Sequence, residues 1–196
     1  MAQELDPCFK EINVENVNSC PNDETVAGLA TKLYYIPEAH VATFTKPPKT
    51  NTTSFENRIT IPTTGLVPVT GKGWKKIDVL VEENELGNIT VGNKGNKKTK
   101  AELDVFIKGF KKQIVGFQNA HLNTPMIYGI PDSTGQMWII GNKENPAFFD
   151  TSEIKTGKKS EDNSGLTGKI SANATVLAYD GEMTIIPDTI TPPSGS

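Results

Sequence analysis

Three glutamates within four residues form the sharpest group of acidic side chains in this sequence. Glu82, Glu83 and Glu85 lie between two apolar stretches. Two carboxylates held close together can act as general acid and general base. No histidine or candidate nucleophile is near them in the sequence, and in a connection between strands such residues more often form a solvated rim. The cluster therefore indicates an exposed acidic turn rather than a catalytic pair.

Histidine and cysteine, which supply many catalytic bases, nucleophiles and zinc ligands, are rare in the chain. It has His40, His121, Cys8 and Cys20. Their spacing assembles no set of nucleophile, base and acid, and a zinc site would need ligands scattered in an unfamiliar way. We therefore expect no enzymatic activity, no metal and no cofactor. The two cysteines are read as reduced thiols that could pair in an oxidising environment.

A loop rich in glycine and lysine, residues 92–98, precedes a stretch with helical periodicity. Glycine-rich loops before helices can bind phosphate through their backbone N–H groups. The sequence GNKGNKKTK fits neither the P-loop spacing nor the dinucleotide-binding spacing of glycines. The lysines of this loop instead predict a solvated basic patch that is available to a neighbouring acidic surface.

Composition indicates a β-rich protein with long loops. The hydrophobic share of the 196 residues is 36%, the net charge is −3, and glycine and proline number 17 and 13. Arg58 is the sole arginine among the 20 basic residues, which argues against sequence-specific nucleic-acid binding because arginine makes most bidentate contacts to bases. No apolar run is long enough to span a membrane, and the first residues lack the pattern of a secretory signal, so we expect synthesis in the cytoplasm.

Residues 96–141 contain the strongest local patterns. A helix is predicted over about 99–121, because apolar residues recur there at spacings of three and four and Thr99 with Glu102 has the form of a capping box. Two apolar runs over 126–140, separated by a turn, predict a β-hairpin. The apolar face of the predicted helix consists of Leu103, Phe106, Ile107, Phe110, Ile114 and Phe117.

Together with this hairpin, alternating or apolar runs along the chain predict about eight to ten strands. One of them, over 167–179, is unusually long, and Asp180-Gly181 predicts a tight hairpin after it. Its inward side chains are small, so Phe106, Phe110 and Phe117 of the helix are expected to cover them. The fold class is therefore mainly β, a β-sandwich or open barrel with one flanking amphipathic helix and long extended loops. The other predicted strands cover residues 28–36, 41–45, 55–61, 74–81 and 86–91.

Three regions are expected along the chain. Residues 1–27 are polar and weakly patterned and predict an N-terminal arm, and residues 187–196 predict a flexible C-terminal tail. Residues 28–186 are expected to form a single β-rich domain. Two long polar loops, 45–54 and 156–165, leave that domain, and loops of such length are usually functional or disordered.

The order of these features resembles the tail tube (major tail) proteins of tailed bacteriophages and the related tube subunits of contractile injection systems. The resemblance covers roughly residues 28–186. It lies in strand pairs with a long polar loop, one amphipathic helix, an immediate hairpin with the sequence IYGIPDSTGQMWIIG, and a closing long strand before Asp180-Gly181.

The resemblance implies a virion structural protein with no catalytic residues. Such subunits assemble as stacked hexameric rings around a channel for DNA. The partners would be further copies of the chain and other virion or tail proteins, DNA would pass without base readout, and no membrane would be bound. The location would be the virion tail after synthesis in the host cytoplasm.

Two sets of residues are candidates for these roles. Glu82, Glu83 and Glu85 could face the channel, because an acidic or neutral lumen lets DNA slide without sticking. Polar residues of the loops are candidates for contacts between subunits. These candidates are Lys46, Thr50, Asn51, Lys94, Lys97, Lys98, Lys158 and Lys159.

Two other functions fit the same composition. A capsid or head-decoration protein would form or bind shells instead of tubes. A carbohydrate-binding β-sandwich would use Trp74, Trp138 and Tyr34 as a stacking platform, although Trp138 lies amid apolar residues and core packing is the better interpretation for it.

Overall fold

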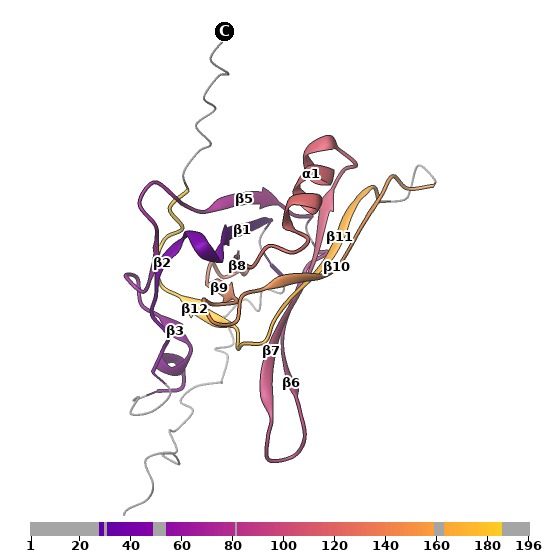
Figure 1. The fold of residues 1–196 in the computed structure, drawn as a ribbon. Helices are drawn as coiled ribbons and strands as arrows, with labels where there is room; N and C mark the ends of the chain where they lie inside the picture. The colour runs from indigo at the N-terminus through magenta and orange to yellow at the C-terminus, as the bar shows by residue number, and fades with distance from the viewer. Residues whose placement is uncertain (1–27, 30, 49–53, 81, 159–162, 186–196) are drawn as a thin grey trace, which may run out of the picture.

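The computed structural model describes residues 28–29, 31–48, 54–80, 82–158 and 163–185. The predicted N-terminal arm 1–27 and C-terminal tail 187–196 lie outside the described residues, as do Thr50, Asn51 and Lys159. The described residues are mainly β, with three sheets and one α-helix (Figure 1), which confirms the predicted fold class.

A six-stranded sheet forms the middle of the structure, with the strand order β3-β12-β9-β8-β1-β5. Neighbouring strands are antiparallel except β3 and β12, which are parallel. The strands are β1 (Lys32–Pro37), β3 (Thr60–Ile61), β5 (Lys75–Asp78), β8 (Met126–Pro131), β9 (Met137–Ile140) and β12 (Leu177–Tyr179).

A four-stranded antiparallel sheet has the order β10-β11-β7-β6, and a two-stranded sheet pairs β2 with β4. The hairpin of β6 and β7 extends beyond the rest of the described chain, at the bottom of Figure 1. The strands are β2 (Val41–Phe44), β4 (Leu66–Pro68), β6 (Glu85–Val91), β7 (Lys98–Lys108), β10 (Phe148–Lys155) and β11 (Gly165–Ala172).

Two apolar cores lie on opposite faces of the six-stranded sheet. Alternate residues of β8 enter them in turn, because successive side chains of a strand point to opposite faces. Tyr128 and Ile130 join the core beneath the four-stranded sheet, together with Leu103 and Ile170. Ile127 joins the second core, which includes residues of the two-stranded sheet. The five residues from Met126 to Ile130 are all buried as a result.

The single α-helix of the described residues, α1, covers Lys112–His121 and packs beside β10. Its Gln118 Nε2 donates to the backbone oxygen of Ser152 at 3.1 Å and to its Oγ at 3.0 Å. Two short 3₁₀ helices, η2 (Glu38–His40) and η3 (Glu56–Arg58), connect strands.

The predicted helix over 99–121 is wrong in its first half. Residues 98–108 form β7, the longest strand, and the predicted capping box of Thr99 and Glu102 lies within it. Ala101, Leu103 and Val105 point into the core and alternate with charged residues, which is the two-residue period of a half-buried strand. Gly109, with φ of +104°, then redirects the chain toward α1, and Phe110 is left 51% exposed.

The long strand predicted over 167–179 is two strands in different sheets. β11 ends at Ala172, and β12 begins at Leu177 after a bend. The hairpin predicted at Asp180-Gly181 is also wrong, because the chain after it does not return along β12. Ile185 instead forms a parallel bridge to Trp74, and the backbone N–H of Trp74 donates to the oxygen of Thr184 at 3.1 Å.

Phe110 is exposed and does not belong to the core, so its substitution should affect stability much less than substitution of the buried Leu103. Phe110→Asn should lower the free energy of unfolding by less than about 0.5 kcal/mol, as for other exposed positions. Leu103→Ala should lower it by about 2–5 kcal/mol, because Leu103 is fully buried in the core. Urea denaturation of the two variants measures both values. A larger loss for Phe110→Asn than for Leu103→Ala would contradict the assignment of residues 98–108 to a strand.

Candidate assembly surfaces

The outer face of the four-stranded sheet is strongly charged but balanced in sign. The side chains that alternate with the buried residues of its strands point away from the core. On this face lie as many lysines as carboxylates. The charged residues of the face are Lys98, Lys100, Lys108, Lys155 and Lys169 with Glu85, Glu102, Asp104, Asp150 and Glu153.

Glu102 is the centre of an ion-pair network that joins three strands of this face. Its carboxylate lies 2.7 Å from the Nζ of Lys169 on β11 and 3.0 Å from the Nζ of Lys100 on its own strand, β7. Lys100 also lies 3.2 Å from Asp150 on β10. The hydrogen bond from Lys169, followed by that from Lys100, lowers the pKa of Glu102 below its usual value. The hydrogen bond to Glu102 raises the pKa of Lys169.

Both edges of the four-stranded sheet, β6 and β10, pair with no further strand among the described residues. The edge strand β6 carries Ile89 and Val91 on the outer face, and both are more than a third exposed. Unpaired edges with apolar side chains are templates for adding a strand of another chain. At the other end of β6, Glu85 lies directly opposite Asp104 of β7, and like charges in such a pair are destabilising.

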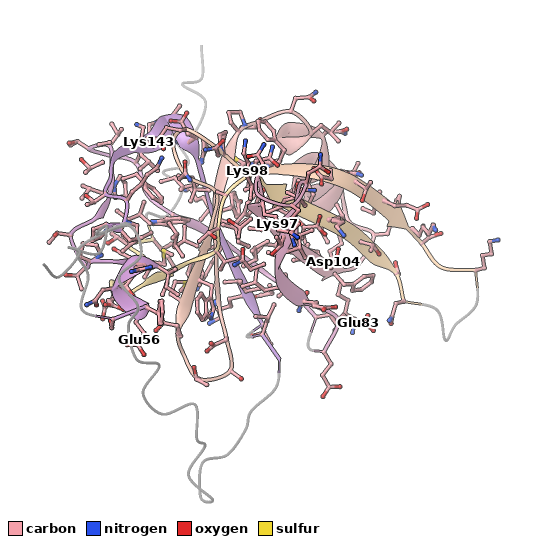
Figure 2. All side chains as sticks on the ribbon, turned by 90° about the horizontal axis from the view of Figure 1, so that it is seen from below. Glu56, Glu83, Lys97, Lys98, Asp104 and Lys143 are labelled. Atoms are coloured by element: carbon pink, nitrogen blue, oxygen red, sulfur yellow. The ribbon has the colours of Figure 1, made fainter. Side chains whose placement is uncertain are left out.

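The acidic candidates occupy the turn into β6. Glu82, whose φ is +63°, and Glu83 are exposed, and Glu85 is the first residue of the strand. Asn84 holds this turn in place, because its Oδ1 accepts from the N–H of Phe106 at 3.1 Å and its Nδ2 donates to the oxygen of Leu80. Figure 2 labels Glu83 and Asp104 at this end of the sheet. Whether these glutamates face a channel stays a prediction.

The basic candidates Lys94, Lys97 and Lys98 lie at the far end of the same hairpin. All three are exposed. Six residue steps separate Glu85 from Val91, so an acidic end and a basic end of the hairpin are about 20 Å apart. The sequence pattern does not predict that these glutamates and lysines belong to one hairpin, because it predicts a helix over the residues that form β7.

The remaining contact candidates lie on other loops. Lys46 follows β2 and forms an ion pair with Glu144 at 2.6 Å, with both side chains largely exposed. Lys158 is exposed after β10. An exposed pair such as that of Lys46 contributes little to stability.

A groove lies between the tip of the β6–β7 hairpin and the loops beside β3 and β12. Its volume is about 660 Å³. The hairpin contributes Lys97 and Lys98, and Arg58, at the end of η3, also lines the groove. Figure 2, which views the hairpin from below, labels Lys97 and Lys98 near the centre of the molecule.

No metal-binding group is assembled in the part of the chain that the structure describes. No set of three or more histidine, cysteine, aspartate or glutamate side chains there could hold a metal ion. His121 is engaged within α1, where its Nδ1 lies 2.7 Å from the oxygen of Phe117 and its ring contacts those of Phe117 and Tyr35.

The tryptophans do not form an exposed platform for sugar stacking. Trp74 is only 2% exposed and belongs to the second core. Trp138 is half-buried, and its Nε1 donates to Asp132 Oδ2 at 2.9 Å. Asp132 also accepts from the N–H groups of Thr134 and Gln136, so Trp138 helps to fix the β8–β9 hairpin.

Comparison with known proteins adds no assignment: no protein family, no curated protein and no solved structure matches the chain. None of the described helices is long and apolar enough to cross a membrane.

The Glu102 network predicts a pH-dependent contribution to stability. A carboxyl group whose pKa is lower in the folded state than in the unfolded state stabilises the fold above its ordinary pKa, here 4.5, and loses this effect as the pH falls through the folded value. Glu102→Gln should therefore lower the thermal midpoint above about pH 5, and the difference from the wild type should vanish at lower pH. Scanning calorimetry across this range measures the difference.

Glu153→Gln is the matched control, because Glu153 lies on the same face but pairs with Lys155 where both side chains are about two-thirds exposed. A pH-independent effect of Glu102→Gln, or an equal effect of Glu153→Gln, would show that the network does not hold the three strands together.

Proposed function

We propose that the chain is a virion structural protein, a tail tube subunit that assembles into stacked rings around a channel for DNA. The observation that carries this proposal is a four-stranded antiparallel sheet with a charge-balanced outer face, whose two edge strands pair with no further strand in the described part of the chain. The resemblance described above points to the same function. The partners are other copies of the chain and other tail proteins, and the location is the virion tail.

The direction of the edge strands suits a closed ring. Successive strands in the order β10-β11-β7-β6 are antiparallel, so β10 and β6 run in opposite directions. When copies stand side by side in the same orientation, β6 of one copy can therefore extend its sheet by antiparallel pairing with β10 of the next. The contact joins two different surfaces, and such heterologous contacts form rings when the rotation closes. Closure removes every open edge of this sheet.

Six copies would form a wide channel. A ring of six copies joins about 24 strands, and strands spaced by about 4.8 Å and tilted by about 40° give a barrel about 48 Å across between backbones. Barrels with fewer strands, such as porins, already enclose a water-filled channel. A barrel of this size leaves room for a large polymer inside its layer of side chains.

The charges of the outer face suit a surface along which DNA slides. Phosphates are bound chiefly by lysine and arginine side chains. On this face Lys100 and Lys169 already pair with carboxylates, and the lysines are matched in number by acidic residues. Glu85 belongs to the same face, and Glu82 and Glu83 precede it at the rim. A lumen with this lining would hold DNA weakly and without base readout.

The edge contact can be tested by changing apolar residues of β6. Ile89→Lys combined with Val91→Lys places charges at the proposed strand-pairing edge, where edge lysines discourage strand addition. We expect wild-type protein to form rings or tubes in negative-stain images, and the double variant to remain monomeric with an unchanged thermal midpoint.

The matched control is Val67→Lys combined with Val69→Lys, since these valines are exposed to a similar degree on and beside β4. This control variant should still assemble. Wild-type protein that stays monomeric at all salt and protein concentrations would overturn the proposed function, and closed shells instead of tubes would favour a head protein.

A further inference from the structure

The groove beneath the β6–β7 hairpin has cationic side chains in its lining, beside apolar ones such as Ile59 and Leu177. Lys46, Arg58, Lys97 and Lys98 contribute to it, and no carboxylate does. The rest of the lining is rich in asparagine and threonine, including Asn145, which can donate or accept hydrogen bonds. This combination of charge and hydrogen-bonding groups fits a ligand that carries carboxylates.

The basic residues of the groove differ in the partners that they have among the described residues. Lys46 is paired with Glu144, which lies outside the lining. The guanidinium of Arg58 lies 5.3 Å from the ring centre of Phe55. Lys97 and Lys98 form no ion pair with any carboxylate of the described residues. Both residues line the groove, although the side chain of Lys98 belongs to the outer face of β7. The hairpin tip therefore presents two adjacent lysines that have no ion pair with a described carboxylate.

The described chain begins next to this groove. Leu29 forms a bridge with Asp132 and lines a second cavity of about 420 Å³. Ile59 and Thr175 line both this cavity and the groove, so the two are adjacent. The chain that precedes Leu29 is therefore attached close to one end of the groove.

The segment before the described residues is the acidic part of the sequence. Residues 1–27 carry one lysine and six carboxylates, a net charge of −5, whereas the whole chain carries −3 and residues 28–196 therefore carry +2. Fully extended, 27 residues span about 90 Å, so the segment is long enough for its more distant carboxylates to reach any part of the groove. The acidic residues of the segment are Glu4, Asp6, Glu11, Glu15, Asp23 and Glu24.

We propose that residues 1–27 bind in the groove of their own chain, with their carboxylates paired to Lys97 and Lys98. The charge of the segment, the charge of the groove and the attachment at Leu29 all favour this occupant. The contact ties the β6–β7 hairpin to the loops beside β3 and β12 and matches the unpaired charge at its tip. It does not depend on the function proposed above.

Zero-length carbodiimide cross-linking tests the proposal, because this reagent joins an amine to a carboxylate only when the two are in contact. Full-length protein labelled with ¹⁵N is mixed with unlabelled protein, treated and digested, and the linked peptides are identified by mass spectrometry. We expect Lys97 or Lys98 linked to a carboxylate within residues 1–27, in peptides that carry a single isotope label.

Other cross-links would overturn the proposal. Links from Lys97 or Lys98 to Glu82, Glu83 or Glu85 in peptides of mixed label would identify the acidic turn of a second copy as the occupant. Links to residues 1–27 in peptides of mixed label would show exchange between chains. The absence of any link from the two lysines to residues 1–27 would show that the segment does not bind there.

A second measurement uses Cys8 and Cys20, which are the two cysteines of the chain. A spin label on them reports the mobility of the segment without further substitution. Lys97→Glu combined with Lys98→Glu should increase this mobility and abolish the cross-links. Lys111→Glu combined with Lys112→Glu, which changes an adjacent exposed pair at the start of α1, should leave both unchanged. Equal effects of the two double variants would mean that overall charge, and not the groove, holds the segment.

Discussion

Burial of β8 on both faces is the constraint on which the remaining layers depend. A strand whose successive residues are all apolar must be covered on both sides, since its side chains alternate between the two faces of the sheet. The four-stranded sheet covers one face, and the two-stranded sheet with its loops covers the other. The three layers therefore follow from one short central strand, and only the outermost faces remain in contact with water.

The four-stranded sheet is in consequence apolar on one face and charged on the other. Its inner residues, such as Leu103 and Ile170, are fully buried, whereas Glu102 on the outer face bridges lysines of two strands. Ion pairs between exposed groups contribute little to stability, but a network that crosses strands favours one register over its neighbours. The outer face thus carries no large excess of either sign, and its edge strands β6 and β10 have no further strand beside them among the described residues.

The strand β7 shows how two patterns can compete within one stretch of sequence. Leu103, Phe106 and Phe110 fit a helical spacing, and Ala101, Leu103 and Val105 fit a strand spacing over the same residues. The strand forms because β6 and β11 are available on either side to satisfy its backbone groups. The helical spacing is realised only from Lys112 onward, where no neighbouring strand competes. Phe106 lies on the outer face of β7 and is nevertheless nearly buried. An apolar residue on this face interrupts the two-residue alternation of the strand and so resembles a helical spacing.

Local patterns in the sequence correctly predict a mainly β protein, a helix that ends near His121 and a hairpin over 126–140. These features depend on local spacing, turn residues and composition, which do not require knowledge of distant partners. Three features depend on tertiary contacts. Residues 98–108 form a strand, residues 167–179 are divided between two sheets, and the chain after Asp180 pairs with Trp74 through Ile185. Tertiary contacts also decided the network around Glu102, the open edges of β6 and β10, and the groove at the hairpin tip. Each of these brings together residues far apart in the sequence, and the free energy of such contacts is absent from any local pattern.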